Sequence, residues 1–118
     1  MTDITIYHNS LCSKSRATLA ILKSVEKANI KIINYLETPP TVDALKEIIS
    51  QLGFGSARQL IRTGEAIYKT LNLTDDSTET SLLNAMVCNP KLIERPIVIA
   101  NNKAKIGRPP ESVLAILS

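Results

Sequence analysis

The sequence predicts an α/β fold built on a mixed four-stranded sheet, with the element order β-α-β, a helical insertion, then β-β-α. Three observations lead to this prediction. The first 35 residues contain a strand pattern, a helical pattern and a second strand pattern. The middle of the chain shows only helical spacing, and the last third returns to strands around an Asn-Asn turn. The 118 residues fit one domain, residues 1–118, with the helical insertion at about 41–94.

The N-terminal third is expected to form a β-α-β unit. Ile4-Thr5-Ile6-Tyr7 alternates apolar and polar residues, which predicts a strand, and residues 8–11 form a connector. From Cys12 onward apolar residues recur at helical spacing to about Ala28. Residues 31–35 then predict a second strand. Because a helix connects the two strands, we expect them to be parallel.

The helical insertion should begin at Thr41, whose side chain suits a helix N-cap, and its first helix should end near Gly53. Shorter helices are expected at 57–61, 65–71 and 80–87. The C-terminal part should contain a strand at 96–100, a turn at Asn101-Asn102, a strand at 103–106 and a closing helix at 111–117. This order is the thioredoxin-like arrangement with an insertion.

Composition excludes several classes of function. The net charge of +3 is spread along the chain and aromatic residues make up only 3%, so we expect no nucleic acid partner. No apolar run approaches the roughly 20 residues that span a bilayer, so no membrane association is expected. No export signal is visible at the N-terminus, which favours a cytoplasmic protein. The single histidine, His8, and the lack of a CxxC pair argue against a metal site.

Cys12 is the candidate nucleophile because it stands between the first strand and the first helix, where free helical N–H groups point. A free thiol is only about 3% thiolate at pH 7. A helix N-terminus stabilises an anion by about 0.3–1 kcal/mol, whereas a two-unit fall in pKa needs about 2.7 kcal/mol. Additional cations or donors are therefore required, and the local candidates are His8, Lys14, Ser15 and Arg16.

Cys88 lies in an apolar helical stretch, so we expect it to pack in the core. Ser15 stands where a dithiol redox enzyme has its second cysteine. Without an internal resolving thiol, the disulfide must form with an external one, and glutathione is the natural cytoplasmic candidate.

With Cys12 placed, the sequence resembles the glutaredoxin-dependent arsenate reductases, the ArsC family of thioredoxin-fold proteins, and especially its short members. The resemblance runs over nearly the whole chain. The matching blocks are Ile4-Thr5-Ile6-Tyr7-His8-Asn9, Cys12, Ser15-Arg16, Tyr35-Leu36-Glu37-Thr38-Pro39-Pro40, Ala57-Arg58-Gln59-Leu60-Ile61-Arg62, Asn89-Pro90, Glu94-Arg95-Pro96-Ile97-Val98 and Gly107-Arg108-Pro109. The chain departs from many members at Ser10, where they have proline.

The resemblance implies that Cys12 attacks arsenate or a similar oxyanion while Arg62, Arg95 and Arg108 bind it. Planar guanidinium groups match the oxygens of a tetrahedral dianion with paired hydrogen bonds. His8 would favour the thiolate electrostatically or through hydrogen bonds. Ser15, Arg16 and Pro96 are supporting residues, and the peptide bond before Pro96 is expected to be cis.

The implied reaction needs no bound cofactor and uses glutathione as co-substrate and glutaredoxin as partner. Glutathione adds to the arsenic on Cys12, glutaredoxin removes that glutathione as a mixed disulfide, and arsenite is hydrolysed from Cys12. Two other readings stay open. One is an RNA polymerase-binding regulator like Spx, which usually has a CxxC switch that this chain lacks. The other is a glutathione-dependent thiol oxidoreductase acting on another substrate.

Overall fold

The computed structural model describes residues 2–117, and these residues form two compact units. The first unit consists of the chain up to Thr38 and from Arg95 onward. The second unit is the intervening segment, Pro39–Glu94. The second unit includes residues 41–94, the approximate range in which the sequence predicts a helical insertion.

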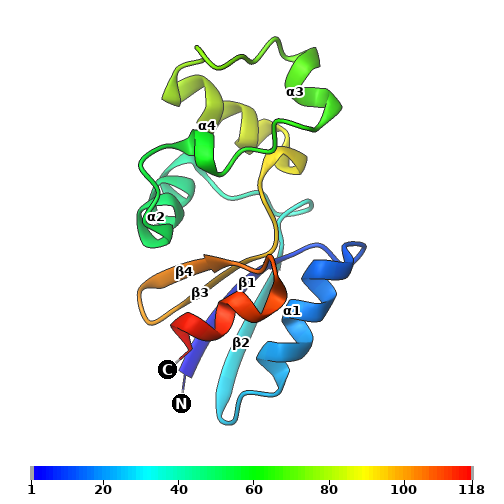
Figure 1. Cartoon of the computed structure of the whole chain (residues 1–118), viewed down its shortest axis with the longest axis vertical. Helices are drawn as coiled ribbons and strands as arrows, with labels where there is room; N and C mark the ends of the chain where they lie inside the picture. Colours follow the sequence, from blue (N-terminus) through cyan, green and yellow to red (C-terminus); the bar gives the residue numbers. More distant parts are fainter. Residues whose placement is uncertain (1, 118) are drawn as a thin grey trace. The chain divides into compact units, whose positions relative to one another are not determined.

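The first unit is built on the predicted four-stranded sheet (Figure 1). Its strand order is β2-β1-β3-β4. β1 pairs in parallel with β2, β3 is antiparallel to both β1 and β4, and the α/β fold class is thereby confirmed. The strands are β1 (Thr2–His8), β2 (Ala28–Asn34), β3 (Ile97–Ala100) and β4 (Lys103–Ile106).

One face of the sheet carries the core of this unit. Ile4 lies opposite Ala100, and Ile6 opposite Val98, so these four side chains share a face. The helix α1 (Ser13–Lys23) and the C-terminal 3₁₀ helix η3 (Pro110–Ile116) pack on it (Figure 1). Leu22 of α1 and Val113 of η3 are fully buried there.

The largest differences from the sequence prediction concern the end of α1, the start of β2 and the type of the closing helix. α1 ends at Lys23 rather than near Ala28, because the chain turns through Lys27, which has a positive φ of 56°. Ala28 instead begins β2, where it pairs with Thr2 of β1. This long-range pairing overrides the weak strand propensity of the Ala-Asn sequence. The closing helix is present, but as a 3₁₀ helix.

The strand pairing places four connections at one end of the sheet. Tyr7, next to the last residue of β1, lies opposite Ile33 near the end of β2 and Ile97 at the start of β3. Ile97 in turn lies opposite Ile106, the last residue of β4. The residues that follow β1, β2 and β4, and those that precede β3, therefore meet at this end.

The second unit is helical. Thr41 caps α2 by accepting a hydrogen bond from the N–H of Ala44, and Gly53 ends it with a φ of 77°, as predicted. Glu79, the first residue of α4, accepts hydrogen bonds of 2.7 Å from Ser56 Oγ and 2.8 Å from the N–H of Ala57. The helices of this unit are α2 (Val42–Leu52), η1 (Ala57–Gln59), α3 (Ala66–Thr70), α4 (Glu79–Cys88) and η2 (Pro90–Leu92).

Cys88 corrects one expectation, because it is exposed rather than packed in the core. The buried face of α4 carries Leu82, Leu83 and Met86. At about 100° per residue, Cys88 points roughly 200° away from Met86, toward the opposite side of the helix. An apolar sequence context therefore did not indicate which face this cysteine occupies. Within residues 2–117, no helix has the length and apolar character needed to cross a membrane.

Candidate active site

Cys12 lies at the N-cap of α1, directly after a tight turn that leaves β1. The carbonyl oxygen of Asn9 accepts a 3.0 Å hydrogen bond from the N–H of Cys12. The Asn9 side chain accepts another of 3.0 Å from the N–H of Leu11. Arg16 adds a third restraint, because its Nη1 donates to the carbonyl oxygen of Ser10 at 2.9 Å. The turn is thus fixed by hydrogen bonds in a chain that has Ser10 in place of proline.

The Cys12 thiol lies in surroundings that favour its thiolate. Burial by itself would raise its pKa, but hydrogen bonds from the backbone N–H of Ser15, the Arg95 side chain and the backbone N–H of Lys14 act against it. The positive charge of Arg95 adds to these effects, and the net result is a lowered pKa of Cys12. A thiol with a lowered pKa at a helix N-terminus has the character of a reactive cysteine.

The Arg95 guanidinium interacts with Cys12 and also with Tyr35. Tyr35 follows β2 directly and Arg95 precedes β3, so the sheet brings both residues to the end where Cys12 follows β1. Burial raises the pKa of the Tyr35 phenol, while Arg95 and the side chain of Asn9 partly oppose that rise. The phenol therefore remains protonated near pH 7.

Tyr35 and Asn9 were not among the predicted site residues. The available signal was topological. Two parallel strands end at the same edge of a sheet, so a polar aromatic residue after the second strand lies beside the loop that follows the first.

His8 is the last residue of β1 and is buried, whereas the sequence placed it in a connector. Its Nδ1 is 2.6 Å from Ser15 Oγ, which also accepts a 3.0 Å hydrogen bond from the N–H of Asn9. Burial lowers the pKa of His8, and the positive charges of Lys23 and Arg16 lower it further. Because its ring is neutral, His8 is better suited to a hydrogen-bonding role than to an electrostatic one. That role is exerted through its contact with the buried Ser15 hydroxyl.

The Arg95-Pro96 peptide bond is cis, as predicted, and Arg108-Pro109 is a second cis bond that was not predicted. The N–H of Gly107 donates a 2.9 Å hydrogen bond to the carbonyl oxygen of Pro96. Gly107 approaches α1 so closely that a Cβ built on it would overlap the Thr18 hydroxyl and lie 2.9 Å from Pro96 Cγ. Glycine is therefore required where this loop passes α1.

Arg108 joins the same group of residues through the backbone. Its Nε donates a 2.8 Å hydrogen bond to the carbonyl oxygen of Arg95, and its side chain is otherwise exposed. Of the three arginines expected to bind an oxyanion, the first unit thus brings two, Arg95 and Arg108, to the Cys12 end of the sheet.

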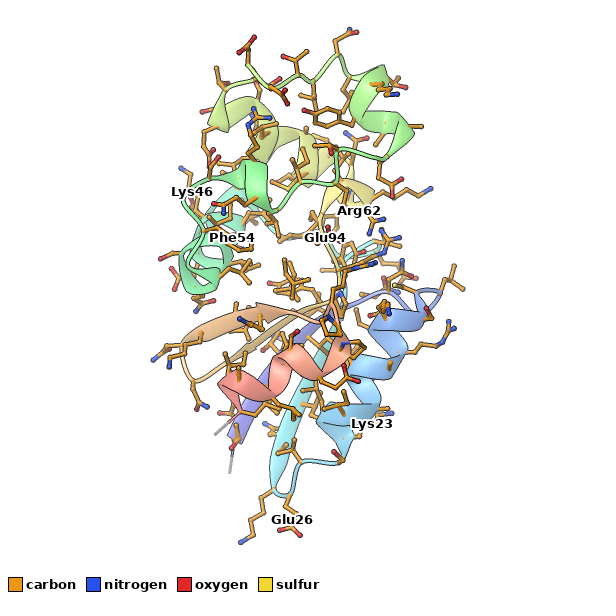
Figure 2. The ribbon with its side chains drawn as sticks, in the orientation of Figure 1. Lys23, Glu26, Lys46, Phe54, Arg62 and Glu94 are labelled. Atoms are coloured by element: carbon orange, nitrogen blue, oxygen red, sulfur yellow. The ribbon has the colours of Figure 1, made fainter. Side chains whose placement is uncertain are left out.

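Arg62 belongs to the second unit, where it forms ion pairs with two carboxylates. One of them, Glu94, is labelled beside it in Figure 2. Arg62 Nη1 is 3.2 Å from Glu94 Oε1, and Arg62 Nε is 3.3 Å from Glu65 Oε1. The backbone supports this arrangement, because the N–H of Arg62 donates a 2.7 Å hydrogen bond to the carbonyl oxygen of Leu92. The N–H of Glu94 likewise donates to the carbonyl oxygen of Leu60. The joint action of Arg62 with Cys12 stays a prediction.

The arrangement around Cys12 suits nucleophilic attack by a thiolate on an anionic centre. The helix N–H groups and Arg95 stabilise negative charge on sulfur. Arg108 adds an exposed guanidinium whose Nε is hydrogen-bonded to the backbone of Arg95. Among residues 2–117, no three His, Cys, Asp or Glu side chains gather in a way that could hold a metal ion.

The chain is similar to known proteins over nearly its whole length. Residues 7–116 match the ArsC family. The chain is 53% identical over 116 residues to the uncharacterized protein YfgD of Escherichia coli (strain K12), covering 98% of this chain and 97% of YfgD. It is 48% identical over 117 residues to an arsenate reductase of Haemophilus influenzae (strain ATCC 51907 / DSM 11121 / KW20 / Rd), covering 98% of this chain and 99% of the relative.

A solved structure has the same fold. The arsenate reductase from Vibrio cholerae superposes with a TM-score of 0.93 at 48% sequence identity, covering 98% of both chains. The ArsC family match covers 110 residues of the chain, and the two relatives are 53% and 48% identical over nearly its full length. The chain is therefore a member of the ArsC family.

Proposed function

We propose that this protein is an arsenate reductase that uses Cys12 as its nucleophile. The observation that carries the proposal is the Cys12 thiol at the N-terminus of α1, with its pKa lowered by backbone N–H groups and by Arg95. Similarity to relatives named arsenate reductase selects arsenate among the anions that such a site could accept.

In the proposed first step the Cys12 sulfur forms a bond to the arsenic of arsenate, and one arsenic–oxygen bond breaks. The departing oxygen takes up protons and leaves as water, so arsenic remains in the +5 state. Arg95 and Arg108 stabilise the charge on the remaining oxygens with guanidinium hydrogen bonds. Arg62 is assigned to the same anion on the strength of its place in the ArsC pattern.

Two external thiols complete the proposed reaction. Glutathione replaces a second arsenic oxygen, which leaves as water. A glutaredoxin thiolate then attacks the glutathione sulfur and forms a mixed disulfide. The electron pair of the broken sulfur–arsenic bond stays on arsenic, which becomes As(III) on Cys12. Water releases arsenite and restores the Cys12 thiol. This route needs no second thiol from the chain itself, so Cys88, the last residue of α4, has no part in it.

Arsenite production by the purified protein tests the proposal. The reaction would contain arsenate, glutathione, glutaredoxin, glutathione reductase and NADPH, with each component omitted in turn. The proposal predicts arsenite formation that stops when arsenate, glutathione or glutaredoxin is left out. Arsenite formation that continues without glutaredoxin would remove the mixed-disulfide step. No arsenite from the complete mixture, with folded protein, would overturn the proposed activity.

A further inference from the structure

Tyr35 is a buried group at the Cys12 site to which the proposed reaction gives no role. The residue is only 1% exposed. Its phenol oxygen is shielded from solvent and has no well-aligned hydrogen-bond partner among residues 2–117. A buried hydroxyl without such a partner lowers stability, and a phenylalanine ring would fill the same space without that cost. The hydroxyl therefore calls for an explanation outside packing.

The polar groups that act on this phenol are the side chains of Arg95 and Asn9. Arg95 acts at the same time on the Cys12 sulfur. A guanidinium is planar and rigid and carries five N–H donors, so one edge can face a phenol oxygen while another faces a thiolate. The Tyr35 phenol stays neutral near pH 7, so it is an acceptor that adds no competing charge.

Asn9 connects the phenol to the other side of the nucleophile. The Asn9 carbonyl oxygen holds the N–H of Cys12, and its side chain holds the N–H of Leu11, each at 3.0 Å. Tyr35 thus contacts both the cation that faces the thiolate and the turn that presents it.

We propose that Tyr35 is a positioning residue, whose phenol oxygen orients the Arg95 guanidinium so that it faces the Cys12 thiolate. The inference rests on the part of the proposed function that makes Cys12 the nucleophile. Without the phenol oxygen, the Arg95 guanidinium loses one of the polar groups that interact with it and turns toward solvent. The thiolate then loses the guanidinium that interacts with it, so its pKa rises.

The test is the titration of Cys12 in Tyr35→Phe, followed by the thiolate absorbance near 240 nm. A Cys88→Ser background leaves Cys12 as the only thiol. Loss of an oriented cation is expected to raise the pKa of Cys12 by about one unit, with up to about a tenfold fall in thiolate on the acid side of the titration. Alkylation by iodoacetamide at fixed pH should slow by the same factor. The melting temperature should stay the same or rise.

Tyr68→Phe is the matched control. Tyr68 is the other buried tyrosine whose phenol oxygen lacks a well-aligned partner in the described chain, and it belongs to the second unit. The same substitution there should leave the Cys12 titration unchanged. A change in the Cys12 titration that Tyr35→Phe causes and Tyr68→Phe does not can therefore be assigned to the location of the Tyr35 hydroxyl.

A double-mutant cycle with Arg95→Gln identifies the route of the effect. If Tyr35 acts through Arg95, Tyr35→Phe should raise the pKa of Cys12 no further once Arg95 is replaced. Arg95→Lys is a second, independent variant. This variant keeps the positive charge but loses the planar guanidinium with its fixed donors, so it should raise the pKa of Cys12 as Tyr35→Phe does.

An unchanged Cys12 titration in folded Tyr35→Phe would overturn the inference, and so would equal effects of that substitution with and without Arg95. An unchanged titration in Arg95→Lys would also contradict it. None of these measurements contains arsenate. They can therefore succeed while arsenite production fails, which separates the inference from the proposed activity.

Discussion

The Nε atom of Arg108 donates a 2.8 Å hydrogen bond to the carbonyl oxygen of Arg95, so one arginine of the expected oxyanion set holds the backbone of another. That carbonyl belongs to the cis peptide bond before Pro96. The N–H of Gly107 in turn holds the carbonyl oxygen of Pro96 at 2.9 Å. The two loops at this end of the sheet therefore support each other, and substitutions in either should affect the site.

Arg108→Ala is expected to weaken arsenate binding. The change removes one guanidinium and the restraint on the Arg95 backbone. Loss of a charged hydrogen bond of about 1.5–3 kcal/mol corresponds to a rise in KM for arsenate of about 10- to 150-fold. Steady-state arsenite production checks it. Arg108→Lys keeps the positive charge but lacks the Nε donor, so its KM for arsenate should lie between those of the wild type and Arg108→Ala. A KM unchanged by Arg108→Ala would remove this residue from the oxyanion site.

Gly107→Ala is expected to destabilise the first unit. The added methyl would overlap the Thr18 hydroxyl and press on Pro96, and overpacking of this kind costs about 1–3 kcal/mol. Urea denaturation measures the change. Gly64→Ala is the matched control, because nothing lies within 4 Å of a Cβ at that position and its φ is not positive. Equal stability of the two variants would mean that the loop at Gly107 does not lie against α1.

The rate of Cys12 alkylation should depend on pH in a way that shows its lowered pKa. Only the thiolate reacts, so the midpoint of the rise in rate with pH should lie below that of an ordinary thiol. The measurement compares iodoacetamide alkylation of the Cys88→Ser protein with that of glutathione across the pH range. A midpoint equal to or above that of glutathione would contradict the stabilisation by Arg95 and the helix N–H groups.

The same shift makes stability depend on pH. Because the pKa of Cys12 is lower in the folded than in the unfolded chain, the unfolded chain binds more protons between the two values, and stability rises with pH there. This contribution is complete above the unfolded pKa and disappears as pH falls through the folded pKa. Cys12→Ser lacks it. The difference in unfolding free energy between wild type and Cys12→Ser should therefore shift in favour of wild type as pH rises.

Arg62→Gln is expected to raise the KM for arsenate by about tenfold or more, if Arg62 supplies a charged hydrogen bond to the oxyanion. Arg58→Gln is the control from the same unit. Arg58 donates to the carbonyl oxygen of Ser77 at 3.0 Å and lies near Asp75, so its loss should affect stability but not KM. Equal KM values for the two variants would show that Arg62 has only its structural ion pairs with Glu65 and Glu94.

The arrangement of the first unit could be predicted from sequence because its signals are local and strong. The alternation at 4–7 and the Asn101-Asn102 turn identify their elements directly, and both Asn residues have positive φ. The end of α1 could not be predicted, because no Gly or Asn indicates the left-handed conformation at Lys27. The start of β2 depends on pairing with β1, which is a long-range property.

The candidate site divides in a similar way. The place of Cys12 followed from the order of strand and helix, and the cis bond before Pro96 followed from the resemblance to the thioredoxin fold. The link from Tyr35 to Arg95 could not be predicted, because it depends on side chains from two separated segments that meet only in the folded sheet. The face of α4 that Cys88 occupies was mispredicted, since hydrophobic neighbours do not define a face without their spacing.

The central claim is that Cys12 alone carries the thiol chemistry of arsenate reduction, and arsenite production by two serine variants tests it most directly. Cys12→Ser should produce no arsenite, because a serine hydroxyl is hardly ionised near pH 7 and cannot replace the thiolate. Cys88→Ser should keep full activity, and its stability should change by no more than about 0.5 kcal/mol because Cys88 is exposed. Loss of turnover in folded Cys88→Ser, or arsenite from Cys12→Ser, would contradict the account.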